Sequence, residues 1–449
     1  MAGGVFITQN KIRPGFYHRF TRAARERGLF SPIGVAALPL ELDWGDAEAI
    51  VSIDADATQS EAMRKLGHNM QDVLLVRECL KRAQTLRFYR VNTDGGVKAT
   101  LDMSPQPVTA TAKYVGELGN EIRVQIDDDP NDPTKYIVRT YLNAIEMDSQ
   151  SNIQNAEDIK GNDWVDFAGT GAITAAAGGS LVGGLNGATT ADTHNKFLKA
   201  LETEEFNSFG LPVDDPTYKE MYAAAVIHYA NDLGKLVQCI LPNYDSTSYE
   251  GITSMKNGVI LTDGTTITAE QSVAWMTGAS AAAGAGTSLT YSAYDGALQP
   301  DTILSDDEIK AAIAAGQIVF IPQTDDQGQR IAVVEQDINT MTRITDDRPE
   351  EWKKNRMVRS IYYLVNTMHR VWHLYYIGKV DNNETGRTLF KSDLVDVMGN
   401  LVQDGAFENF DAEHDILVKQ GEKRDAVVAE IAVQPVDAME KMYFTVEVN

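Results

Sequence analysis

Two histidines on one predicted helix are the first candidates for a metal site. His369 and His373 are four residues apart within Glu351–Ile377, a segment with helical spacing of apolar residues, so both would lie on one helix face. Zinc proteases place a glutamate directly after the first histidine, and Arg370 occupies that position here. No third ligand is evident in the sequence, so the pattern favours structural histidines over a metal centre.

An acidic run resembles the start of a calcium-binding loop. It begins at Asp127 and reaches Asp132, which stands where the turn glycine of such a loop belongs. Position twelve would be Val138 instead of a bidentate glutamate. The run therefore predicts an exposed acidic turn.

A glycine-rich stretch, Gly183–Gly187, precedes Thr189 and a predicted helix, as a phosphate-binding loop would. It lacks the Lys-Ser/Thr pair of a P-loop, and its spacing differs from the dinucleotide-binding fingerprint. We interpret it as a glycine turn with a threonine cap. An α/β nucleotide-binding protein or enzyme that uses the turn near Gly184 remains the main alternative. No nucleophile elbow and no cysteine motif occurs, so we predict no enzyme, no catalytic residue, no cofactor and no metal.

Composition narrows the class of protein. The 449 residues are 43% hydrophobic and 23% charged, which is typical of a globular protein with two to four folded units. The net charge of -24 argues against a nucleic-acid coat. Cys79 and Cys239 are the only cysteines, which indicates intracellular synthesis without a disulfide framework. The opening MAGGVFITQN shows no export signal, which argues against a surface-layer protein.

Two uncharged stretches, Phe167–Ala191 and Gln271–Tyr294, are long enough to cross a bilayer. They consist of Gly, Ala, Ser and Thr with few large apolar side chains. We therefore predict flexible or closely packed segments and no membrane partner.

The elements around these candidates alternate in a way that predicts an α/β multi-domain chain, α+β overall. Strand and helix patterns alternate first, give way to short strands separated by turns, and then return. We predict an α/β core with an inserted β-sandwich-like domain and a C-terminal α/β domain with exchanged terminal strands. The boundaries that we predict are 1–30 for a basic arm with a donated strand, 31–94 for the first part of the core, 95–150 for the insertion, 151–347 for the rest of the core and 348–449 for the C-terminal domain.

Both ends of the chain have features of assembly arms. Six basic residues and a single acidic one, Glu26, occupy the first thirty positions, a balance of 6 − 1 = +5 in an acidic protein. Such an arm could bind the acidic surface of another copy. Gly4–Thr8 and the alternating Met442–Val448 are strand candidates, and a terminal strand must pair with something. Both could be donated to another copy by β-augmentation, or both could pair within their own subunit.

Several segments in chain order resemble the contractile-tail sheath family of myophages, phage-tail-like bacteriocins and related injection systems. The most specific is Val334–Thr340, and the likeness covers nearly the whole chain. One departure is the turn Gly183–Gly187, where Thr-Asp-Gly would follow the glycine pair. The other segments are Lys11–Tyr17, Leu40–Gly45, Ala110–Tyr114 with Gly119-Asn120, Asn257–Val259, Thr262–Gly264, Ala274–Ala279, Lys354–Arg356, Tyr376–Val380 and Val433–Lys441.

The resemblance, which is nearest to sheaths of Gram-positive phages and prophage-like particles, implies a structural subunit of a contractile sheath. Hexameric rings of the subunit would stack helically around a tail tube and contract to drive the tube through a target cell envelope. The implied partners are other copies of the chain, the tail tube protein, and baseplate and tail terminator proteins. The particle, whether a virion or a phage-tail-like bacteriocin, would be assembled in the bacterial cytoplasm.

The resemblance also suggests which residues make contacts between subunits. Val5, Phe6 and Ile7 would form a donated N-terminal strand, and Arg13 and Arg19 would meet acidic groups on a neighbour. The remaining hypotheses give a donated C-terminal strand to Phe444, Val446 and Val448, the acceptor sheet to Val428 and Ile431 within Ala426–Val433, and the face toward the tube to Lys353, Lys354 and Arg356.

Overall fold

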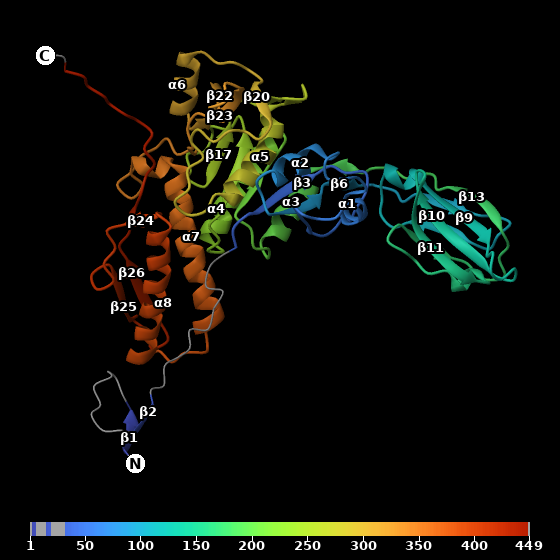
Figure 1. Cartoon of the computed structure of the whole chain (residues 1–449), viewed down its shortest axis with the longest axis horizontal. Coiled ribbons are helices and arrows are strands. Elements are labelled where there is room, and N and C mark those ends of the chain that lie inside the picture. The colour runs from blue at the N-terminus through green and yellow to red at the C-terminus, as the bar shows by residue number, and fades with distance from the viewer. Residues whose placement is uncertain (1, 6–14, 19–31, 448–449) are drawn as a thin grey trace.

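The computed structural model describes residues 2–5, 15–18 and 32–447. Three units follow one another across the molecule (Figure 1). An α/β core lies in the middle, an all-β unit lies at one side of it, and a C-terminal unit of helices and short strands lies at the other side. This arrangement confirms the predicted fold class.

A seven-stranded sheet, in the order β21-β17-β16-β15-β3-β5-β4, forms the core. Its strands are parallel except for β4, which pairs antiparallel with β5. The insertion separates the first three strands from the other four in the chain. Their bounds are β3 (Val35–Leu40), β4 (Val51–Asp54), β5 (Thr85–Arg90), β15 (Ser208–Gly210), β16 (Gln238–Pro242), β17 (Ile252–Met255) and β21 (Gln317–Ile318).

Helices cover both faces of this sheet. Successive side chains of a buried strand point to opposite faces and therefore pack against different helices. Ala37 packs in the cluster with α3 and α4, whereas its neighbours Ala36 and Leu38 pack in the cluster with α1, α2 and α5. The helices on the two faces are α1 (Gln59–Leu66), α2 (Leu74–Leu80), α3 (Ala191–Leu201), α4 (Pro216–Asn231) and α5 (Ala269–Ala282), and α6 (Asp306–Ala314) precedes the edge strand β21.

The first half of the uncharged stretch Gln271–Tyr294 lies in the buried helix α5. A side chain at Gly278 would place its Cβ 2.1 Å from the carbonyl oxygen of Cys79 on α2, so small residues let the two helices approach closely. Small antiparallel sheets extend the core beyond α5. Their strands are β18 (Val259–Leu261), β19 (Thr266–Ile267), β20 (Ala297–Pro300), β22 (Phe320–Thr324) and β23 (Arg330–Val334).

Two antiparallel sheets around one apolar cluster make the inserted unit a β-sandwich. The predicted boundary at residue 150 falls inside β11, and the cluster continues to Leu181. The strand at residues 176–180 was missed because Phe167–Ala191 has too few large apolar residues to show an alternating pattern. The sheets are β12-β8-β7, from β7 (Thr100–Asp102), β8 (Thr109–Ala112) and β12 (Val165–Ala168), and β11-β10-β9-β13, from β9 (Ile122–Asp128), β10 (Tyr136–Leu142), β11 (Ile145–Ile153) and β13 (Ala176–Ser180), with 3₁₀ turns at Glu117–Glu121 and Ala156–Asp158.

The C-terminal unit contains two helices and short strands around its own apolar cluster. The predicted helix Glu351–Ile377 is a 3₁₀ turn (Glu350–Lys353), then α7 (Asn355–Val371), then a π-helical turn (Trp372–Tyr376). The other elements are α8 (Glu384–Gln403), β24 (Phe407–Glu408), β25 (Ile416–Gln420), β26 (Val427–Ile431) and β27 (Gln434–Pro435).

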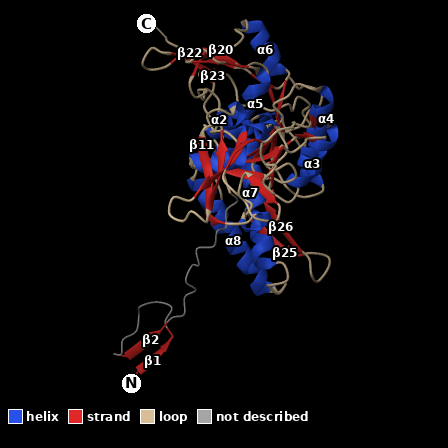
Figure 2. Cartoon of the chain, turned by 90° about the vertical axis from the view of Figure 1, so that its right-hand side faces the viewer, coloured by secondary structure: helices blue, strands red, loops and turns tan. Residues whose placement is uncertain are grey.

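Near the N-terminus, β1 (Ala2–Val5) pairs in parallel with β2 (Gly15–His18). Both strands lie apart from the main body, beyond the end of the C-terminal unit (Figures 1 and 2). The predicted strand Gly4–Thr8 overlaps β1 only at Gly4 and Val5, and its other residues lie outside the described ones.

Candidate assembly surfaces

The hairpin β25–β26 is the candidate acceptor sheet. Its two strands pair antiparallel from Ile416 opposite Ile431 to Gln420 opposite Val427 and pack against α8. Ile431 lies on the inner face with the apolar cluster, whereas Val428 lies on the outer face and is 37% exposed. Among the described residues this sheet has only two strands, so each strand presents a free edge that another strand could extend.

From β26 the chain runs back along the helices toward the core. Ala432 N–H donates to Asp415 O at 2.9 Å, β27 pairs with β24, and Val436 N–H donates to Ala406 O at 3.0 Å. The predicted strand Met442–Val448 follows. Its described residues 442–447 have no sheet partner within the described chain, and Phe444 and Val446 are 75% and 66% exposed. Val448 lies outside the described residues.

The N-terminal hypotheses fall mostly beyond what the structure describes. Val5 is the last residue of β1. Phe6, Ile7, Arg13 and Arg19 lie outside the described residues. Their proposed contacts with a neighbour therefore stay predictions.

The three residues predicted to face a tube lie where the C-terminal unit joins the core. Lys354 forms an ion pair with Glu440, and Arg356 Nη2 donates to Gly405 O at 3.3 Å. Lys353 is half-buried and lines a shallow cavity of about 240 Å³ together with Lys354 and Lys441. The tube-facing role of Lys353, Lys354 and Arg356 stays a prediction.

The glycine-rich turn joins the β-sandwich to the core. Gly184 exchanges two hydrogen bonds with the side-chain amide of Asn120, and a Cβ at Gly187 would lie 2.3 Å from the carbonyl carbon of Thr93. The Oδ1 atom of Asn186 accepts from Arg90 Nη2 at 3.2 Å. Both Gly184 and Asn186 are therefore bonded to neighbouring protein segments, as a structural turn requires and a phosphate cradle does not.

Arg90 is the centre of this junction. Its side chain is fully buried and also donates to the carbonyl oxygen of Val115 at 2.6 Å and to Asn92 Oδ1 at 3.2 Å. Burial lowers the pKa of Arg90 to about 10, against the charge of Asp43, which raises it. The two connections to the sandwich run together here as β6 (Asn92–Asp94) and β14 (Ala188–Thr189), which pair antiparallel.

The other chemical candidates do not form sites in the described chain. His369 and His373 are both exposed, and no group of three or more His, Cys, Asp or Glu side chains among the described residues is arranged to hold a metal ion. Asp127 accepts from Arg139 at 3.1 Å, and Asp132 accepts within its own turn. In residues 2–5, 15–18 and 32–447, no helix is both long and apolar enough to cross a membrane.

A buried polar network between the core and α7 was not anticipated from the sequence. Asp337 pairs with Arg359 at 2.5 Å and accepts from Asn355 Nδ2 at 3.0 Å. Asn355 Oδ1 in turn accepts from Gln238 Nε2 at 3.1 Å, and Ser280 donates to Gln238. These contacts tie β16 and α5 to the C-terminal unit.

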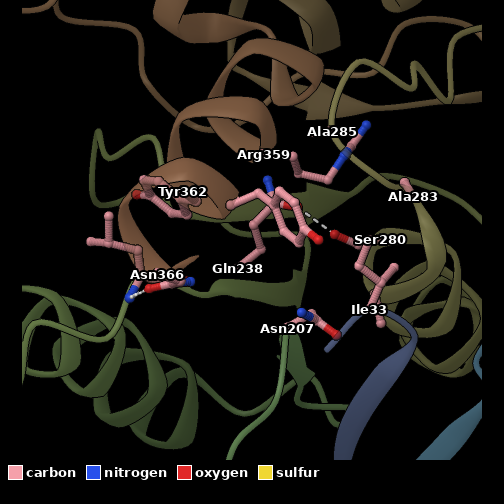
Figure 3. A pocket seen from close by; sticks show the side chains of 12 residues that line it. Ile33, Asn207, Gln238, Ser280, Ala283, Ala285, Arg359, Tyr362 and Asn366 are labelled. Carbon is pink, nitrogen blue, oxygen red and sulfur yellow. Dashed lines mark hydrogen bonds between the residues drawn. The ribbon is translucent and has the colours of Figure 1, made fainter. Parts of the chain in front are cut away.

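Figure 3 shows the core end of this network around a small cavity of about 40 Å³, which Gln238, Ser280, Arg359, Tyr362 and Asn366 help to line. The signal that could have identified the network was available, because Asp337 and Asn355 belong to two of the segments that carried the resemblance. Sequence separation hid the fact that these segments meet.

Comparisons with known proteins agree with this architecture unit by unit. Four family models match consecutive parts of the chain: "Tail sheath protein Gp18 domain III N-terminal region" at residues 34–91, "Phage tail sheath protein beta-sandwich domain" at 94–186, "Phage tail sheath protein central domain" at 187–340 and "Phage tail sheath C-terminal domain" at 347–449. A Bacillus subtilis (strain 168) protein, "Phage-like element PBSX protein XkdK", is 34% identical over 477 residues, with 100% of both chains covered.

The chain belongs to the phage tail sheath family. It is a structural subunit of a contractile tail sheath, as predicted, and the nucleotide-binding alternative is not favoured. The family builds phage-tail-like particles.

Solved sheath structures have the same fold. The sheath tail protein of Desulfitobacterium hafniense is 36% identical with a TM-score of 0.80, over 96% of this chain and 100% of that one. The sheath tail protein Lin1278 of Listeria innocua is 31% identical with a TM-score of 0.81, over 92% of this chain and 94% of that one. The contracted helical sheath of the anti-feeding prophage is 11% identical with a TM-score of 0.56, over 98% of this chain and 100% of that one, a likeness of fold.

Proposed function

We propose that copies of this sheath subunit form hexameric rings, stacked helically around a tail tube, and that terminal strands link each copy to its neighbours. The observation that carries this proposal is that the chain has both an unpaired extended segment and an unpaired sheet edge. Residues 442–447 alternate apolar and polar and are exposed, while the hairpin β25–β26 presents unpaired edges within the described chain. An extended segment on an open sheet edge gains backbone hydrogen bonds along its whole length.

The two halves of this contact lie apart in one copy. The C-terminal segment leaves the molecule beside β22 and β23, whereas β25 and β26 lie toward the opposite end of the C-terminal unit (Figures 1 and 2). Pairing therefore requires another copy. By the same argument Val5, Phe6 and Ile7 would add an N-terminal strand, with Arg13 and Arg19 against acidic groups of an acidic neighbour.

The remaining partners follow from a sheath around a tube. The tail tube protein would lie against the region of Lys353, Lys354 and Arg356, and baseplate and terminator proteins would cap the two ends of the polymer. Assembly would take place in the bacterial cytoplasm. The subunit would act by assembly and contraction, without catalysis, nucleic acid or a membrane.

Strand donation can be tested by disulfide trapping between two singly substituted chains. Val446→Cys would be mixed with Ile431→Cys, which lies on the inner face of β26, under mild oxidation. The two native cysteines are buried and should not interfere. A crosslinked heterodimer that disappears with the added change Phe444→Asp supports donation of the C-terminal strand to β26. Thr445→Asp, on the other face of the same strand, is the matched control and should leave the crosslink intact. No crosslink at concentrations that support polymers in electron micrographs would contradict the proposed contact.

A further inference from the structure

One side chain near the C-terminus is held while its neighbours are not. Met439 and Met442 are 104% and 82% exposed, so they contact little of the described chain. The side chain of Glu440, between them, is only 11% exposed. A glutamate that is more buried than the methionines beside it indicates a specific binding site for its side chain.

Three side chains from three distant segments bind this carboxylate. Lys354 forms an ion pair with Oε2, Gln336 Nε2 donates to Oε2 at 3.1 Å, and Thr290 Oγ1 donates to Oε1 at 2.9 Å. Burial by itself would raise the pKa of Glu440, but the hydrogen bonds from Lys354, Gln336 and Thr290 bring the pKa below its ordinary value. The carboxylate is therefore ionised and fully bonded at neutral pH.

The binding site for Glu440 consists of residues of the same subunit. Asp337 N–H donates to Thr290 Oγ1 at 3.0 Å. Tyr291, which follows Thr290 in the chain, has φ +58°, a left-handed conformation that is rare for a bulky side chain. Lys354 is bridged to Ile338 through the backbone. The turn at Thr290 and Tyr291 thus meets Gln336 and Lys354 around the buried Asp337–Arg359 pair.

This contact differs from an ordinary surface ion pair, which contributes little to stability because both charges stay in water. Lys354 and Glu440 are 19% and 11% exposed, and two neutral donors complete the coordination. Three segments that resemble the sheath family, Val334–Thr340, Lys354–Arg356 and Val433–Lys441, each supply one member of the group.

We propose that Glu440, Lys354, Gln336 and Thr290 form a latch that fixes the root of the C-terminal arm, the segment around Glu440, on its own subunit. Only the residues from Met442 onward, which form the arm, then pass to a neighbour. The purpose of the latch rests on the proposed strand exchange, whereas the latch itself is a property of a single subunit.

The latch shortens the mobile tether. With it, the free chain before Phe444 begins at Glu440; without it, the last bonded residue is Val436, which donates to Ala406 O. The tether then doubles from four residues to eight (444 − 440 and 444 − 436). In an assembled polymer the acceptor edge is already held near the arm, and effective concentration falls roughly as the −3/2 power of tether length. Opening the latch should therefore slow capture of the arm within the polymer by about threefold.

The first measurement follows the arm root in the full-length monomer. A spin label on Met439→Cys reports local mobility, and the native cysteines are buried. Mobility should rise with Glu440→Ala and with Lys354→Met, and should return toward the parent value in the charge exchange of Glu440→Lys with Lys354→Glu. Glu447→Ala, a carboxylate removed from the free segment, is the matched control and should change nothing. Unchanged mobility in Glu440→Ala would overturn the latch.

The second measurement tests its purpose. In assembled polymers, where neighbouring copies are already held together, the rate of the 446–431 disulfide crosslink should fall about threefold in Glu440→Ala. A rise in mobility with an unchanged crosslink rate would overturn the role in exchange and leave a mere surface contact. If the parent protein forms no crosslink, strand donation fails while the mobility result still decides whether the latch exists.

Discussion

Arg90 is a cation buried where the chain leaves the core for the β-sandwich. The acceptors of its hydrogen bonds are backbone carbonyls and the amide oxygens of Asn92 and Asn186, so the side chain connects both strands of the junction to the core. None of the acceptors is adjacent to Arg90 in sequence. For this reason the sequence marked the glycine turn as unusual but offered no sign of the cation that holds it.

Removing this cation should destabilise the fold. Arg90→Met leaves buried oxygens without donors, and we expect a loss of about 2–4 kcal/mol in the free energy of unfolding. Urea unfolding followed by tryptophan fluorescence measures it, since Trp44 and Trp164 stack at 5.2 Å near the junction. Arg123→Met, at an exposed position of the sandwich, should change stability by less than about 0.5 kcal/mol. Equal effects of the two substitutions would contradict the role given to Arg90.

Lys235 should make stability depend on pH. Its Nζ donates to the carbonyl oxygens of Leu201, Glu202 and Glu204 at 2.7–2.9 Å, and burial lowers the pKa of Lys235 from 10.5 to about 8. Between pH 8 and 10.5 the unfolded chain binds more protons at this residue, so its contribution to stability rises with pH and is lost as pH falls through 8. The melting temperature of the parent minus that of Lys235→Met should therefore increase from pH 7.5 to pH 10. A flat difference would show that the pKa of Lys235 is not lowered by folding.

At the scale of elements, α5 is the closely packed segment that its composition allowed, although no helix was predicted there. Its residues lack the large apolar side chains of a membrane span and the amphipathic pattern of a surface helix, because it is buried on nearly every side among other helices and strands. Capping residues are the better signal: Thr268 and Gln271 form a capping box at its start. Clear periodicity allowed the α/β alternation and the strand Ala426–Val433 to be predicted. By contrast, β13 consists of Ala, Gly and Ser and shows no periodicity.

Two glycine substitutions separate these cases. Gly278→Ala should destabilise the core by about 1–3 kcal/mol, because its Cβ would lie 2.1 Å from Cys79 O. Gly399→Ala, in the exposed part of α8 with nothing within 4 Å of the added carbon, should stabilise by about 0.8–1 kcal/mol through helix propensity. Thermal unfolding of both variants measures the pair, and a neutral Gly278→Ala would contradict close packing of α2 and α5.

At the scale of the whole molecule, the β-sandwich is attached through two adjacent strands. Asn92 lies opposite Thr189, and Asp94 lies opposite Ala188, so the insertion begins and ends at one place. A chain lacking residues 95–187, with Asp94 joined to Ala188 through an Asn-Gly turn, should keep its core and C-terminal unit. Trp44 packs in the sandwich cluster and would become exposed, so the variant should also carry Trp44→Ser. Circular dichroism and electron microscopy check the result, and an unfolded product would contradict an independently attached domain.

Under the proposed strand exchange, the separation of the C-terminal arm from the hairpin β25–β26 would give the growing polymer a direction. A copy that donated its arm to one neighbour would still offer its own hairpin edge to another, so each added copy would fill one free edge and bring a new one. The two ends of the filament would then differ chemically, one with unfilled hairpin edges and the other with unpaired arms. In the joined polymer, load would pass through the covalent backbone of each donated strand into the next copy, so neighbouring copies could rotate against each other and stay connected.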